Sequence, residues 1–281
     1  MRTTPSSSRS HHEATHWQGI YQATLENLRI TWPHAWPGLP VVLQSCIRRL
    51  WSNHPPPLGS TSGQMLFVAA SMAAHMESLA CVANDEPKYH NRLHTADALT
   101  AICLLIQALK EKHLVVSDEW TAALLLAVTS HDVLHPGGAN GFLQEFEQRS
   151  ANELKKLASN SKVEGDWLHN VIEMVLRTDP TLVPGNHDRV KGTAFEMNLD
   201  WACVLINEAD ILASASPFQG PALGQALAQE WALKNHPLHK VVGTPAGRLH
   251  FLSSLRFSTP ASEAFQIAQS VQQQMEALQH A

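Results

Sequence analysis

The sequence predicts an all-α fold, a compact bundle of many helices. Apolar residues recur at helical spacing along most of the chain. The clearest such stripe lies near the C-terminus and comprises Ala264, Ile267, Val271, Met275 and Leu278. The alternating β-branched segments that form half-buried strands are almost absent. Proline and glycine clusters interrupt the apolar stripes and mark the loops between helices.

The N-terminal third predicts three helices separated by prolines. Residues 1–14 are polar and rich in Thr, Ser, Arg and His, and we expect them to form a disordered tail. Prolines at positions 33, 37 and 55–57 break the pattern that follows. The predicted helices cover residues 17–29, 41–51 and 64–82.

The rest of the chain continues the helical pattern. A loop at 84–88 leads into a helix that runs from about His90 to Leu109. Ser117, with acidic residues directly after it, predicts the N-cap of the next helix, which ends before Pro136. Further helices are expected at 144–157, 166–177, 195–212, 220–233, 247–255 and 260–278, with a loop at 180–193.

Composition indicates one soluble domain, residues 15–281. The chain has 281 residues, 44% of them apolar and 16% charged, and no internal linker divides it. Its formal net charge of −5 gives no support to a nucleic-acid partner. Neither a signal peptide nor an uninterrupted apolar run of membrane-spanning length is evident, so no membrane partner is expected. The four cysteines (46, 81, 103 and 203) lack paired spacing, which indicates reduced thiols and a cytoplasmic location.

Two short stretches concentrate side chains that bind metals. His131 and Asp132 are adjacent at the end of an apolar helical run, and His135 follows just before the helix breaks. In the second stretch His90 and His94 stand four residues apart, so both imidazoles lie on one helix face. Each stretch has a structural alternative: a polar helix end for the first, and a solvated face for the second, since seventeen histidines make chance pairs common.

Together the two stretches resemble a known signature. They read Tyr89-His90-Asn91-x-x-His94-x-x-Asp97 and His131-Asp132-x-x-His135-Pro136-Gly137-x-x-Asn140-x-Phe142-Leu143. The order and spacing resemble those of the class I cyclic nucleotide phosphodiesterases, all-helical metallohydrolases of the HD superfamily. The resemblance extends from about residue 89 to residue 210 and implies a single HD-type catalytic domain of a bacterial-type homologue.

The resemblance implies a binuclear metal site. Asp210 stands in an Ala-Asp-hydrophobic segment like that of the family, although a capped helix end is the alternative interpretation. The implied ligands of the first ion, Zn, Fe or Mn, are His94, His131, Asp132 and Asp210. Asp132 would bridge to a second ion, Mg or Mn, held mostly by water. A hydroxide bridging the two ions would attack phosphorus.

The remaining site residues have proposed roles beside the metals. His90 is the candidate general acid, because it lies one turn before ligand His94 and an imidazolium donates protons near neutral pH. Residues expected to support the ligands or the substrate are Tyr89, Asn91, His135, Asn140, Arg248 and Phe251. For Tyr89, Asp97 and Asn140 a purely structural role is the alternative.

The sequence departs from the family pattern in three places. Leu134 stands where many members have an acidic residue, and Glu153 is only a possible counterpart of a carboxylate that supports the second ion. The family's late purine-binding Gln is missing between residues 246 and 258, where Arg248 precedes Phe251 by three residues. Arg offers donors only, so it suits a second phosphate or an acceptor edge of a base.

The sequence therefore predicts a metal-dependent phosphodiesterase. The leading hypothesis is hydrolysis of a 3′,5′-cyclic nucleotide, cyclic AMP or cyclic GMP, to the 5′-monophosphate. Arg248 motivates an alternative, an HD-type phosphohydrolase acting on a 2′,3′-cyclic nucleotide, a dinucleotide or a nucleotide. A catalytically silent module that binds a nucleotide or a metal is the third hypothesis.

Overall fold

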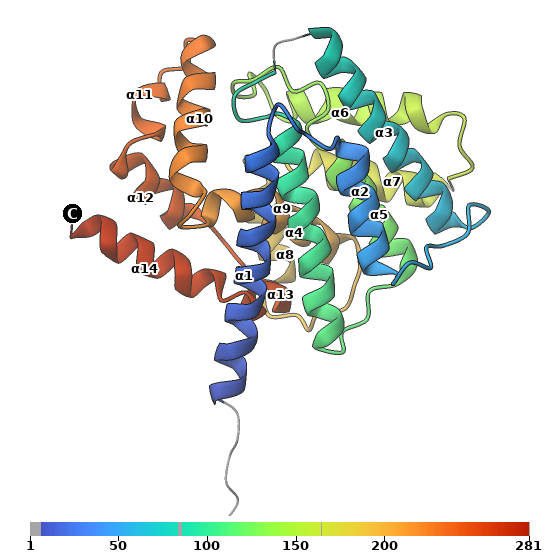
Figure 1. The fold of residues 1–281 in the computed structure, drawn as a ribbon, viewed down its shortest axis with the longest axis horizontal. Coiled ribbons are helices and arrows are strands. Elements are labelled where there is room, and N and C mark those ends of the chain that lie inside the picture. The colour runs from blue at the N-terminus through green and yellow to red at the C-terminus, as the bar shows by residue number, and fades with distance from the viewer. Residues whose placement is uncertain (1–6, 84–85, 164, 281) are drawn as a thin grey trace, which may run out of the picture.

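The all-α prediction is confirmed. A computed structural model describes residues 7–83, 86–163 and 165–280, and these residues form fourteen helices and no strand (Figure 1). The helices are α1 (Ser7–Thr31), α2 (Leu39–Leu50), α3 (Thr61–Ala83), α4 (Arg92–Glu111), α5 (Asp118–Ser130), α6 (Glu145–Ala158), α7 (Gly165–Leu176), α8 (Val183–Val190), α9 (Leu199–Ala215), α10 (Gly220–Leu233), α11 (His239–Val242), α12 (Pro245–Ser254), α13 (Pro260–Ala264) and α14 (Ile267–Gln279).

Helix α4 forms the centre of the bundle. It packs against α1, α2, α5, α9 and α13, and every residue from His94 to Ile106 is buried. Helix α5 is buried from Thr121 to its end and also contacts α3, α7 and α9. The first motif stretch opens α4 and the second directly follows α5, so His94 and His131 are buried, where an unpartnered polar group is costly.

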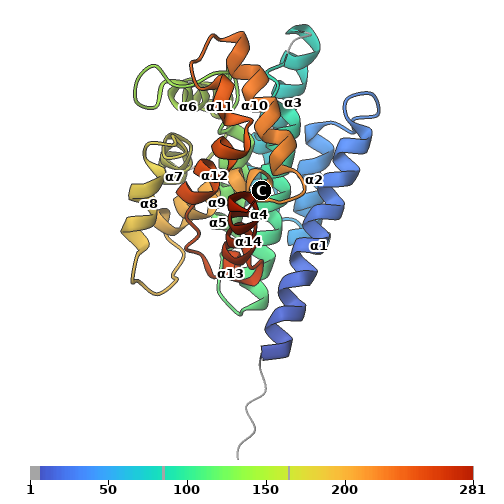
Figure 2. The ribbon, with the colours of Figure 1, turned by 90° about the vertical axis from the view of Figure 1, so that its left-hand side faces the viewer.

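The C-terminal helices cover one side of this core. Helices α10, α11, α12 and α14 lie to one side of α4 and α9, and α2, α3, α5, α6 and α7 lie to the other (Figure 1). Seen from that C-terminal side, α1 runs along one edge of the molecule next to α2 (Figure 2). Helix α10 contacts α9 and α11, and α12 contacts α14. The C-terminal helices are thus placed beside the end of α9, which carries Asp210.

Several helices differ from the prediction. Helix α1 begins at Ser7, so residues 7–14 of the predicted disordered tail are helical, while residues 1–6 lie outside the described part. No proline or glycine stands between Ser7 and Gly19, and extending an existing helix is easier than starting one. The predicted loop 180–193 contains α8, whose Pro184 occupies its first turn, where proline is tolerated. The single helix predicted at 260–278 is divided at Gln266, which has a φ of 51°.

The predicted N-cap and the free cysteines are confirmed. Ser117 caps α5 by accepting a hydrogen bond from the Trp120 amide, and all four cysteines are free.

Among the described residues two helices, α3 and α4, are long and apolar enough to cross a membrane. They were not predicted from the sequence, because neither is an uninterrupted apolar run. Their most apolar windows are 39% buried in α3 and 83% buried in α4, so burial in the core accounts for the composition of α4.

Candidate active site

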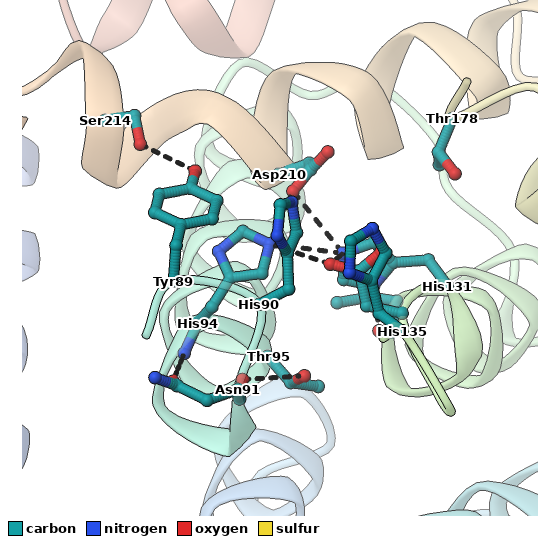
Figure 3. A network of polar contacts seen from close by, with 12 residues as sticks. Tyr89, His90, Asn91, His94, Thr95, His131, His135, Thr178, Asp210 and Ser214 are labelled. Carbon is teal, nitrogen blue, oxygen red and sulfur yellow. Dashed lines mark hydrogen bonds and ion pairs between the residues drawn. The ribbon is translucent and has the colours of Figure 1, made fainter. Parts of the chain in front are cut away.

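Side chains from three parts of the chain converge on one point. His94 projects from α4, His131 directly follows α5, and Asp210 projects from α9 (Figure 3). Asp210 Oδ1 lies 2.9 Å from His94 Nε2 and 3.4 Å from His131 Nε2, and the two Nε2 atoms are 3.4 Å apart. Asp132 Oδ2 lies 3.3 and 3.4 Å from the same two nitrogens. The structure therefore brings the four predicted ligands together.

These distances fit a shared metal ion. Ligand atoms about 2.1 Å from one ion lie roughly 3.0 Å apart in an octahedral shell and roughly 3.4 Å apart in a tetrahedral shell. His131 Nδ1 lies 2.7 Å from the carbonyl of Val128, and donating its proton there leaves the Nε2 lone pair free for a metal. His94 Nδ1 is buried without a hydrogen-bond partner, so only its Nε2 faces polar groups. The donor set and the tautomer both suit a borderline divalent cation.

Charge balance supports the same conclusion. Burial alone would lower the pKa of His131, but Asp132 and Asp210 raise it to about 9. Tyr89 and the same carboxylates raise the pKa of His94 against its burial, and the two imidazoles lower the pKa of both carboxyls against theirs. The imidazoles and the carboxylates thus stabilise each other's charged forms. A divalent cation bound between them would supply the positive charge in place of the protons, because histidine binds a metal in its neutral form.

The local backbone explains how the ligands are presented. Asn91 caps α4 by accepting hydrogen bonds from the amides of Leu93 and His94, which fixes the first turn of the helix that carries the ligand. After α5 the chain turns sharply: Leu134, Gly137 and Gly138 all have positive φ. Only glycine adopts this region without strain, so Leu134 is held there by its surroundings.

His90 does not join this cluster but pairs with a carboxylate that the motifs did not reveal. His90 Nδ1 lies 2.6 Å from Glu230 Oε1 of α10. The face of the His90 imidazole stacks on the His135 ring, with the two ring centroids 3.8 Å apart. Glu230 is 2% exposed and also accepts hydrogen bonds from the amides of Tyr89, His90 and Gly138. Burial alone would raise its pKa, but His90 and these amides lower it to about 2. Glu230 is the single charged residue in the predicted helix 220–233, the one sequence signal that could have singled it out.

His135 completes this second group. Burial and the neighbouring His90 lower the pKa of His135 to about 3, so the ring is neutral at physiological pH. Its Nδ1 accepts a hydrogen bond from the amide of Gly137, and its ring meets that of Phe146 edge-on. His135 therefore supports the position of His90 and of the turn at Gly137.

Tyr89 contacts the cluster, and Asn140 contacts the loop after the second motif. The Tyr89 hydroxyl lies 2.8 Å from Ser214 Oγ, and its ring lies 4.9 Å from that of His94 (Figure 3). Asn140 donates to Glu147 and Asp179 and accepts from the amide of Phe146, which fixes the loop after Gly138.

Other candidates lie away from the cluster. Asp97 forms a two-pronged ion pair with Arg29 of α1. Glu153 of α6 forms ion pairs with His75 of α3 and with Lys156 of its own helix. Arg248 directs its guanidinium to the end of α9 and stacks on Phe251, and the described residues show no contact between either of them and the four ligands.

Comparison with known proteins identifies the motif segment. A profile of the 3′5′-cyclic nucleotide phosphodiesterase family matches residues 89–163, which contain both motifs. Over this segment the chain is similar to the 3′5′-cyclic nucleotide phosphodiesterases. No curated protein sequence matches it at a significant level.

Solved structures extend the likeness to the fold. The phosphodiesterase domain of the RhoPDE fusion protein from the choanoflagellate Salpingoeca rosetta aligns with a TM-score of 0.62 at 15% identity, over 85% of this chain and 88% of that one. LmjPDEB1, solved in complex with IBMX, aligns with a TM-score of 0.65 at 14% identity, over 91% of this chain and 90% of that one. The likeness in fold therefore extends well beyond residues 89–163, to most of the chain.

Proposed function

We propose that this phosphodiesterase domain hydrolyses a 3′,5′-cyclic nucleotide to the 5′-monophosphate. The observation that carries the proposal is the juxtaposition of two groups with different roles. The Nε2 atoms of His94 and His131 lie within 3.4 Å of each other and of one carboxylate oxygen each from Asp132 and Asp210. The His90–Glu230 pair lies beside these four ligand atoms. One group suits a metal, and the other suits a proton donor.

His94, His131, Asp132 and Asp210 would hold the first ion, Zn, Fe or Mn. A second ion, Mg or Mn, would share Asp132. When bound, divalent ions stabilise negative charge on the phosphoryl oxygens and lower the pKa of water. Neighbouring groups of the protein orient the ligands: the Tyr89 ring packs against the His94 ring, and the backbone carbonyl of Val128 orients His131.

His90 would act as the general acid. With Nδ1 donating to Glu230, the nitrogen that remains to carry a proton toward the substrate is Nε2. Protonating the departing sugar oxygen avoids release of a free alkoxide, a contribution of about 10²–10⁴-fold in rate. The stacked, neutral His135 keeps the ring plane fixed without competing for that proton.

The substrate is best identified by a panel. Initial rates with Mn²⁺ or Mg²⁺ would be compared for 3′,5′-cyclic AMP, 3′,5′-cyclic GMP and the 2′,3′-cyclic isomers, with Asp132→Ala as the negative control. We expect turnover of a 3′,5′-cyclic nucleotide by the wild type alone. Turnover restricted to 2′,3′-cyclic or linear esters would overturn the proposed substrate but would support the proposed active site. Equal rates for wild type and Asp132→Ala would overturn the site itself.

A further inference from the structure

The C-terminal end of α9 is closed by two side chains from other helices. A helix leaves its last carbonyls without partners inside the helix. Here three successive carbonyls find donors: Arg248 Nη1 donates to Ser214 O, Gln274 Nε2 to Ala215 O at 2.9 Å, and Arg248 Nη2 to Ser216 O at 3.1 Å. Arg248 Nη2 also donates to Gln274 Oε1 at 2.6 Å, which joins the two side chains.

The surroundings are shaped for this guanidinium. A Cβ on Gly220 would lie 2.3 and 2.4 Å from the two Nη atoms of Arg248, so only glycine at 220 leaves room for it. Phe251 covers one face of the guanidinium with its ring centroid 5.7 Å away. No ion pair links Arg248 to a carboxylate within the described residues. Its charge instead faces the negative end of the α9 dipole, and burial lowers its pKa to about 10.

This closed helix end is connected to the candidate metal site. Ser214 follows Asp210 by one turn on α9, and its Oγ lies 2.8 Å from the Tyr89 hydroxyl (Figure 3). The Tyr89 ring in turn lies 4.9 Å from His94 and 4.7 Å from His90. A shift of the last turn of α9 would therefore move both a ligand and the aromatic ring that packs on two site histidines.

We propose that Arg248 and Gln274 are positioning residues, which clamp the last turn of α9 and through Ser214 hold Tyr89 over His94. Their role in catalysis rests on the proposed function, but the clamp itself does not. Arg is suited to it because its planar fork reaches two carbonyls at once, which a Lys ammonium on a flexible stem does not reproduce. Three of the five N–H donors of Arg248 bond to Ser214, Ser216 and Gln274 of the protein itself.

The test uses the scarcity of tyrosine. The chain has two tyrosines, Tyr21 and Tyr89, so 3-fluorotyrosine labelling gives two ¹⁹F NMR signals, which Tyr89→Phe assigns. We expect Arg248→Lys and the milder Gln274→Met to displace the Tyr89 signal more than the Tyr21 signal. Arg256→Lys is the matched control, because Arg256 also donates to a backbone carbonyl, but its partners Pro184 and Asp188 belong to α8 and not to α9.

A double-mutant cycle separates the clamp from general destabilisation. In a Ser214→Ala background the connection to Tyr89 is cut, so Arg248→Lys should shift the Tyr89 signal no further. Removing groups that orient metal ligands typically weakens metal binding about 10-fold or more, and we expect that loss of Mn²⁺ affinity in Arg248→Lys but not in Arg256→Lys. An unmoved Tyr89 signal in both Arg248→Lys and Gln274→Met, or equal shifts with and without Ser214, would overturn the proposal. Neither readout requires turnover, so failure of the clamp is distinguishable from failure of the proposed function.

Discussion

Replacing Glu230 by Gln tests the acid role assigned to His90. The interactions of Glu230 lower its pKa from 4.5 to about 2, which stabilises the carboxylate by roughly 3 kcal/mol. The carboxylate has one imidazole and three backbone amides as donors, and the amide oxygen of Gln can still accept from the amides. We assign about 1–2 kcal/mol to the His90 contact, which corresponds to roughly a 5- to 30-fold loss in kcat.

The assay compares two leaving groups. A 3′,5′-cyclic nucleotide releases a sugar alkoxide that needs a proton, whereas bis(4-nitrophenyl) phosphate releases a stable phenolate. The Glu230→Gln loss should therefore appear with the nucleotide and nearly vanish with the aryl ester. Glu208→Gln is the matched control, since Glu208 is equally buried and hydrogen-bonded but contacts Ser258, Thr259 and Ser262. Equal losses on both substrates in Glu230→Gln would refute the reasoning.

Three further predictions concern strain, pH and metal content. Leu134→Asn should raise the free energy of unfolding by about 1 kcal/mol in denaturant titrations. Leu134 has a φ of 62° and is 44% exposed, so the relief of backbone strain exceeds the loss of burial. A free energy of unfolding below that of the wild type would contradict this. Burial and Arg256 lower the pKa of His187 from 6.5 to about 4, so as pH falls the unfolded chain takes up the proton first. His187 should therefore contribute a loss of stability of up to about 3 kcal/mol between pH 6.5 and 4, in addition to the loss from His135, and His187→Gln should reduce the slope by that contribution; an unchanged slope would exclude His187 as a source. Asp210→Asn should lose bound transition metal, as measured by elemental analysis after dialysis, and full retention would count against Asp210 as a ligand.

The motif-bearing parts of the site were predictable because their signal is local. His90 and His94 lie one turn apart, and His131 and Asp132 are adjacent, so each pair is visible in a few letters of sequence. The helical fold was predictable for a similar reason, since apolar periodicity is a local property. The helical residues 7–14 were not predictable, because they carry no apolar stripe of their own and extend a helix anchored further along.

The long-range partners were not predictable from pattern. Glu230 lies 140 residues from His90, and nothing in its neighbourhood indicates which histidine it meets. Arg248 was interpreted as a substrate contact because it stands near Phe251 where the family's purine-binding Gln is missing, and because its donors suit a phosphate or a base acceptor. In the structure three of its five donors bond to the carbonyls at the end of α9 and to Gln274, an arrangement that depends on the packing of α12 and α14. Tertiary contacts of this kind leave no periodic trace in the sequence.

The most direct test of the central claim is where solvent oxygen enters the product. The metal-loaded protein would be incubated with 3′,5′-cyclic AMP in ¹⁸O-labelled water, and the product analysed by ³¹P NMR and mass spectrometry. The account predicts 5′-AMP with one labelled oxygen on phosphorus, the outcome of attack at phosphorus with loss of the 3′ oxygen. Formation of 3′-AMP, or no turnover of any 3′,5′-cyclic nucleotide while the metal is bound, would contradict it.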